Sequence, residues 1–124
     1  MTTLRSLVVL VALTGVAAAQ QAARSPEVAA ADVQRWLGFW DKLVTTVAKP
    51  QTCERMAVEV SSLVDHNKDA VAIVRTARQQ GKKLPESAQQ HMLDGVKKMV
   101  PAMQKCGQHE RVRAAFAKLD LSRR

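Results

Sequence analysis

The sequence contains no tyrosine, and only two tryptophans and two phenylalanines among its 124 residues. It also lacks the alternating apolar and polar runs and the turn dipeptides that are typical of β-hairpins. The scarcity of aromatic side chains makes the chain a poor candidate for nucleic-acid binding, because bases are commonly held by aromatic stacking. The abundance of Ala, Val, Lys, Arg and Gln instead predicts an all-α protein.

Catalytic motifs are missing as well. The chain has no G-x-S-x-G, no H-E-x-x-H and no Gly-rich phosphate loop. Asp65 and His66 are neighbours in sequence, so on a helix their side chains diverge instead of pairing. We therefore expect a protein that is not an enzyme.

The N-terminal residues predict export. Arg5 precedes a short apolar run from Leu7 to Leu13, and Ala17-Ala18-Ala19 provides small residues for cleavage before Gln20. The apolar run is too short to be a comfortable membrane anchor. We expect residues 1–19 to be a signal peptide and residues 20–124 to form a single helical domain, periplasmic or secreted, without a transmembrane helix.

The only two cysteines are Cys53 and Cys106. Export brings a protein into an oxidising compartment, where a disulfide is the default state of two cysteines. Two free buried thiols are the alternative that a cytosolic location would favour. We predict a Cys53–Cys106 disulfide.

The first helix of the mature chain is predicted over residues 25–49. Ser25-Pro26-Glu27 supplies a capping residue, a first-turn proline and an acid, and Pro50 ends the helix. Trp36 and Trp40 share one face, and we interpret them as core residues rather than as the walls of a ligand pocket. The apolar residues of this face are Val33, Trp36, Leu37, Phe39, Trp40, Leu43, Val44 and Val47.

A helical hairpin is predicted next. Its first arm starts at Cys53 after a capping Thr52 and ends near Gly81. The polar patch 65–69 in its middle either faces solvent or breaks the helix in two, and we favour an unbroken helix. Its second arm runs from residue 85 to 106, with a kink expected at Pro101. The apolar stripe of the first arm is Cys53, Met56, Val60, Leu63, Val64, Val71 and Val74, and that of the second is Met92, Val96, Met99, Met103 and Cys106.

A last helix is predicted from His109, as its cap, to Asp120, with Val112, Ala115, Phe116 and Leu119 on its apolar face. The fold class is therefore all-α, an up-and-down bundle of about four helices with a disulfide-tied helical hairpin.

Cofactor sites are not indicated. Cys106-Gly-Gln-His109 lacks the second cysteine of a haem attachment motif. The methionines of the second arm lie on its predicted core face, where packing is their usual role. We expect no cofactor and no metal, and keep a metal- or haem-binding bundle as the alternative function.

The charge is unevenly distributed. Residues 20–74 include six basic and seven acidic side chains, whereas residues 75–124 include twelve basic and four acidic. Two interpretations remain open: cations compensating helix dipoles at C-terminal turns, or a surface for an anionic envelope component or an acidic protein. The candidate anion-binding residues are Arg75, Arg78, Lys82, Lys83, Lys97 and Lys98.

Three segments, Cys53-Glu-Arg-Met, Lys83-Leu-Pro-Glu and Met103-Gln-Lys-Cys106, together resemble small exported bacterial helical proteins. In that class one cysteine opens a helix and another closes a later one. The class has no assigned activity, so the resemblance implies export and a helical fold but no function. The sequence as a whole indicates an exported, non-enzymatic binding or structural protein.

Overall fold

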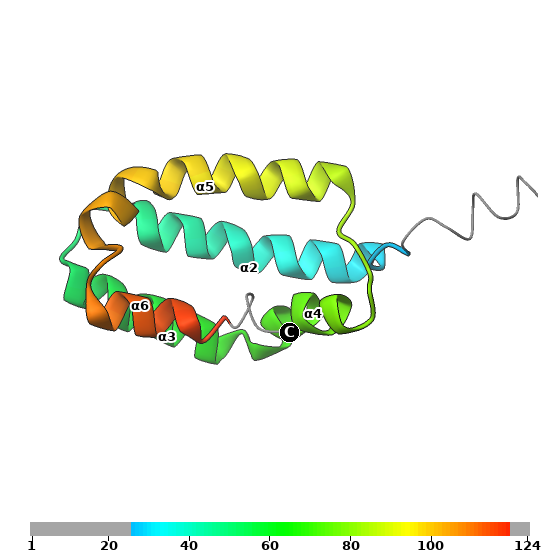
Figure 1. Ribbon diagram of the computed structural model, residues 1–124, viewed down its shortest axis with the longest axis horizontal. Helices are drawn as coiled ribbons and strands as arrows, with labels where there is room; N and C mark the ends of the chain where they lie inside the picture. Colours follow the sequence, from blue (N-terminus) through cyan, green and yellow to red (C-terminus); the bar gives the residue numbers. More distant parts are fainter. Residues whose placement is uncertain (1–25, 120–124) are drawn as a thin grey trace, which may run out of the picture.

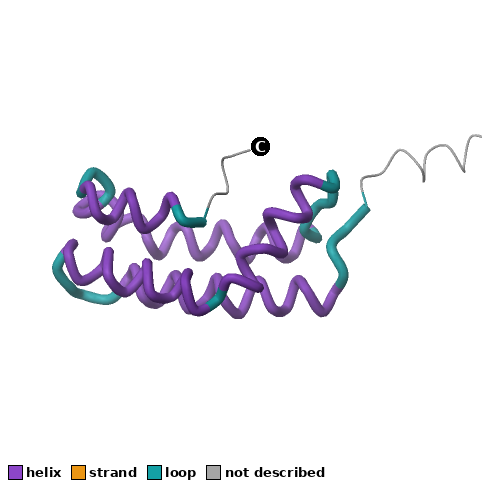
Figure 2. The backbone as a smooth tube through the Cα atoms, turned by 90° about the horizontal axis from the view of Figure 1, so that it is seen from below, coloured by secondary structure: helices purple, strands orange, loops and turns teal. Residues whose placement is uncertain are grey.

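The computed structural model describes residues 26–119, which form five helices and no strand (Figure 2). The predicted signal peptide lies outside these residues. The helices are α2 (Ala30–Ala48), α3 (Cys53–His66), α4 (Lys68–Gln79), α5 (Glu86–Cys106) and α6 (Glu110–Ala117). The predicted all-α class is confirmed.

Helix α2 lies in the middle of the bundle, between α5 on one side and α3, α4 and α6 on the other (Figure 1). Its apolar face is as predicted, and only Leu37 remains half-buried. Most of this face, together with Met56 and Val60 of α3 and Met99 of α5, forms the main core, whereas Val33 belongs to a smaller cluster. The two arms of the hairpin are therefore antiparallel, as predicted, but α2 separates them over much of their length.

The predicted start of the first helix is wrong. Instead of opening at Ser25-Pro26-Glu27, α2 begins at Ala30. The residues before it are extended, because Val28 N–H donates to the carbonyl of Lys83 and Lys83 N–H donates to that of Pro26, both at 2.9 Å. Backbone pairing with the α4–α5 loop overrides the local helix-start signal here.

The prediction of an unbroken first arm is also wrong. The helix breaks at Asn67, whose φ of −130° and ψ of 37° leave the helical region. The Asn67 side-chain amide donates to the carbonyl of Leu63 at 2.8 Å, which replaces a backbone partner. The break lets α3 pack on α2 and α6, while α4 packs on α2.

The second arm begins at Glu86 as predicted and continues through Pro101 to Cys106. One member of its predicted buried stripe is misplaced: Val96 is exposed, and Gly95 occupies the contact with α2 instead. A glycine carries no side chain and so gives no apolar signal, which is why the sequence pattern selected the neighbouring valine.

The disulfide between Cys53 and Cys106 is present and joins positions 53 residues apart. It ties the start of α3 to the end of α5, as predicted. His109 occupies the N-cap position of α6 as expected, but its side chain makes no capping bond. Instead, its Nε2 donates to Glu54 at 3.3 Å, beside the disulfide.

Within residues 26–119, no helix is long and apolar enough to cross a membrane.

Candidate anion-binding site

Three of the six predicted anion-binding residues meet at one end of the bundle. Arg78 comes from the last turn of α4, and Lys82 and Lys83 come from the loop that follows. We call these three residues the basic tip. They surround an open pocket of about 490 Å³, the tip pocket, whose other lining residues are Val74, Ala77, Gly81, Leu84 and Gln89.

The loop that carries the basic tip is held in place by its backbone. Gly81 takes a φ of 67°, which glycine adopts without strain. Its N–H donates to the carbonyl of Arg78, and Lys82 N–H donates to that of Ala77 at 2.8 Å, the pattern of a Schellman motif. The bonds between Lys83 and residues 26–28 secure the next position. The lysine side chains therefore project from a fixed backbone.

The tip pocket differs in charge from three other cavities of the structure. Its lining contains three cations and no carboxylate. Each of the others includes at least one aspartate: Asp32 and Asp69, Asp41 and Asp94, and Asp65. Within the described part of the chain, no ion pair involves Arg78, Lys82 or Lys83. The basic tip therefore retains its positive potential for an external anion.

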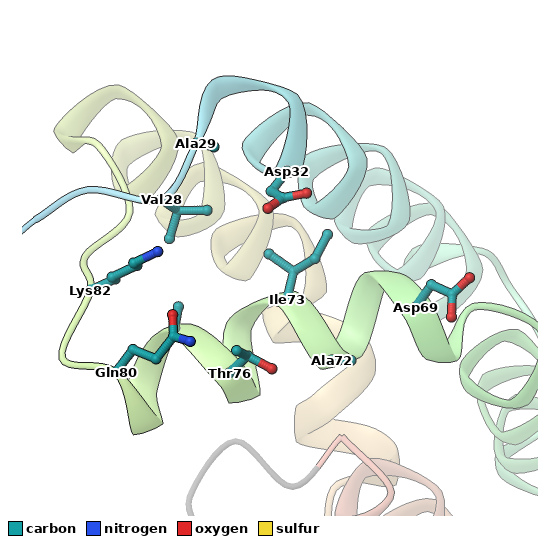
Figure 3. A pocket seen from close by; sticks show the side chains of 10 residues that line it. Val28, Ala29, Asp32, Asp69, Ala72, Ile73, Thr76, Gln80 and Lys82 are labelled. Atoms are coloured by element: carbon teal, nitrogen blue, oxygen red, sulfur yellow. The ribbon is translucent and has the colours of Figure 1, made fainter.

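Lys82 also borders a second, smaller pocket of about 250 Å³ between α4 and the start of α2. Figure 3 shows Lys82 at one end of this pocket and Asp69 at the other, with Asp32 above the middle. The two carboxylates make this pocket a less suitable anion site than the tip pocket.

The other predicted residues do not join the basic tip. Arg75 is half-buried on α4. Lys97 and Lys98 lie on α5, and Lys97 follows Pro85 by about 18 Å of helix. None of these three residues lines the tip pocket.

Lys98 lines a polar cleft between α2 and α5 that the sequence did not predict. Its volume is about 650 Å³, and it contains Asp41, Asp94, Lys49 and His91. His91 Nε2 donates to Asp41 Oδ1 at 2.6 Å across the cleft. The two residues are fifty positions apart, so only the packing of α5 on α2 reveals the pair. With both signs of charge present, the cleft has no net preference for anions.

Two carboxylates have a lowered pKa, and both lie on α3, the helix that begins at Cys53 of the disulfide. The pKa of Glu54 is lowered by a hydrogen bond with its own backbone and by the bond from His109. The pKa of Glu59 is lowered chiefly by its hydrogen bond with Lys49, and also by Arg55. Both carboxylates lie at the surface, where Glu54 joins α3 to the start of α6 and Glu59 joins α3 to the end of α2.

The structure gives no support to the metal or haem alternative. Among residues 26–119, no group of three or more His, Cys, Asp or Glu side chains is placed to hold a metal ion. Cys106 is bonded to Cys53 and so cannot form a haem thioether. Trp36 and Trp40 are buried in the core, in agreement with their interpretation as packing residues.

No protein-family model matches the chain, and no curated protein or solved structure matches it either.

Proposed function

We propose that the protein is an exported, non-enzymatic binding protein that engages an anionic surface of the cell envelope through its basic tip. The observation that carries this proposal is the tip pocket, where three exposed cations converge and no carboxylate lies in the lining. A fixed cluster of cations attracts anions more strongly than the same charges dispersed over a surface.

Export is supported by the N-terminal pattern of Arg5, the apolar run and Ala17-Ala18-Ala19. The disulfide is consistent with export, because such bonds persist in oxidising compartments and are rare in the cytosol.

An extended anionic surface suits the basic tip better than a deep ligand site would. Arg78, Lys82 and Lys83 are all exposed, and they lie around an open pocket rather than an enclosed one. A lipid or polymer surface presents many anions at once, and each Lys or Arg near it contributes about 1 kcal/mol.

The experiment compares two variants that each lose two positive charges. Lys82→Gln/Lys83→Gln removes two tip cations, and Arg35→Gln/Lys42→Gln removes two exposed cations from α2. The tip variant should bind phosphatidylglycerol vesicles more weakly than the wild type by on the order of thirty-fold, whereas the α2 variant should lose much less. Equal losses would mean that the tip cations only compensate the dipole of α4, and preferential binding to an acidic protein would identify a different partner.

A further inference from the structure

Helix α5 exposes an apolar stripe on its outer face. Leu93 is 56% exposed, Val96 44% and Val100 42%. Their spacing of three and four residues places them in one row along the helix. We call these three residues the α5 stripe. Isolated exposed apolar residues are common, whereas a row of three along one helix is an apolar strip of the kind that marks interaction sites.

The α5 stripe is continuous with the basic tip. Gln89 lines the tip pocket and precedes Leu93 by four residues, so it lies on the same face of α5 as the stripe. Lys97 is exposed and lies between Val96 and Val100 in sequence, at the edge of the row. One side of the molecule therefore presents an apolar row with cations at one end and along its margin.

We propose that the α5 stripe inserts into the interface of an anionic lipid bilayer, with α5 lying along the membrane surface and the basic tip against the headgroups. This inference rests on the proposed function and specifies its partner as lipid. Helices that lie in the plane of an anionic membrane typically combine an apolar face with flanking lysine residues. The only carboxylate in the first turn of α5 is Glu86, which leaves the three tip cations and Lys97 in excess on this side.

Charge also argues against a second copy of the chain as the occupant. A two-fold axis through the middle of the α5 stripe would bring Lys97 of one copy close to Lys97 of the other. Like charges held side by side without a counter-charge destabilise an interface. An anionic bilayer instead neutralises Lys97 and covers the apolar row at the same time.

The test uses the triple variant Leu93→Gln/Val96→Gln/Val100→Gln and a control, Val58→Gln. Val58 is an exposed valine of α3, 66% accessible, and lies outside the α5 stripe. All four positions are exposed, so the substitutions should leave the core intact, which far-ultraviolet circular dichroism verifies. The triple variant should bind phosphatidylglycerol vesicles at least about ten-fold more weakly than the wild type, and Val58→Gln should bind as the wild type does.

A soluble anionic polymer, dextran sulfate, separates this inference from the proposed function. The stripe variant should bind the polymer as tightly as the wild type, because a polymer offers no apolar interior. If the stripe variant binds vesicles as the wild type does, the lipid inference is wrong while the basic tip still stands. If the wild type binds neither vesicles nor polymer, the proposed function itself fails. Concentration-dependent dimers that the stripe variant abolishes would identify a second copy as the occupant instead.

Discussion

Gly95 of α5 lies against the indole ring of Trp40 of α2. A Cβ atom at Gly95 would lie 2.5 Å from Trp40 Nε1 and 2.8 Å from Val44 Cγ2. Trp40 and Val44 are both buried, so neither can move aside freely. The absence of a side chain at this position therefore sets how closely α5 approaches α2.

We expect Gly95→Ala to destabilise the protein by about 1–3 kcal/mol, the usual effect of overpacking a core. Chemical denaturation monitored by tryptophan fluorescence measures the change. Gly38 is the matched control, because it is also helical but a Cβ atom added there would meet no atom within 4 Å. Gly38→Ala should be neutral or stabilising by up to about 1 kcal/mol. A Gly95→Ala protein as stable as the wild type would show that α5 can move away from α2 at little cost.

Removing the disulfide should cost stability without changing the fold class. In the chain-entropy model, a bond closing a loop of 53 residues stabilises by about 4 kcal/mol. The Cys53→Ala/Cys106→Ala protein should unfold at correspondingly lower denaturant concentration. Thiol titration of the wild-type protein should find no free sulfhydryl, and two free sulfhydryls would contradict the bond.

Acid should lower the stability of the protein by protonating Glu54 and Glu59. Both Glu54 and Glu59 have a pKa below the usual value of 4.5. A lowered pKa in the folded state gives stability that is present above the unfolded pKa and is lost as the pH falls through the folded pKa. Unfolding midpoints should therefore decrease as the pH falls below the usual glutamate pKa of 4.5.

The variant Glu54→Gln/Glu59→Gln should flatten that decrease. Glu86→Gln is the comparison, because Glu86 makes no ion pair with any other described residue. If both variants retain the full pH dependence of the wild type, the ion pairs of Glu54 and Glu59 contribute nothing to acid sensitivity.

The proposed signal peptide can be tested by identifying the N-terminus of the protein. Mass spectrometry of protein recovered from the exporting compartment should place the N-terminus at Gln20, within a few residues. Recovery of intact chains that begin at Met1 would rule out cleavage.

Much of the fold follows from residue spacing. The apolar face of α2 and the start of α5 at Glu86 were predictable, because helical periodicity and capping residues are local signals. The Cys53–Cys106 pair was predictable for another reason, since these are the only two cysteines of the sequence. The extended backbone before α2 was not predictable from local signals, because its hydrogen-bond partner is Lys83, more than fifty positions away. The break at Asn67 had a local signal in its polar neighbourhood, but such residues also occur on solvent-facing turns of unbroken helices.

The candidate site was only partly predictable for a similar reason. Arg78, Lys82 and Lys83 are close in sequence and remain close in space. Lys98 instead faces the α2–α5 cleft, and the cleft forms only when distant helices pack. The sequence did not predict the α5 stripe, because Val96 fits the spacing of the core residues. The buried position is instead Gly95, which has no side chain and therefore gives no apolar signal.

The salt dependence of wild-type binding to phosphatidylglycerol vesicles tests the central claim most directly. The range of electrostatic attraction shrinks from about 30 Å at 0.01 M salt to about 8 Å at 0.15 M. The protein should bind these vesicles at low salt, binding should weaken at least about ten-fold over this range, and phosphatidylcholine vesicles should show no comparable binding. Binding that is absent at low salt, or equal for the two lipids and insensitive to salt, would contradict an anionic lipid surface as the partner of the basic tip.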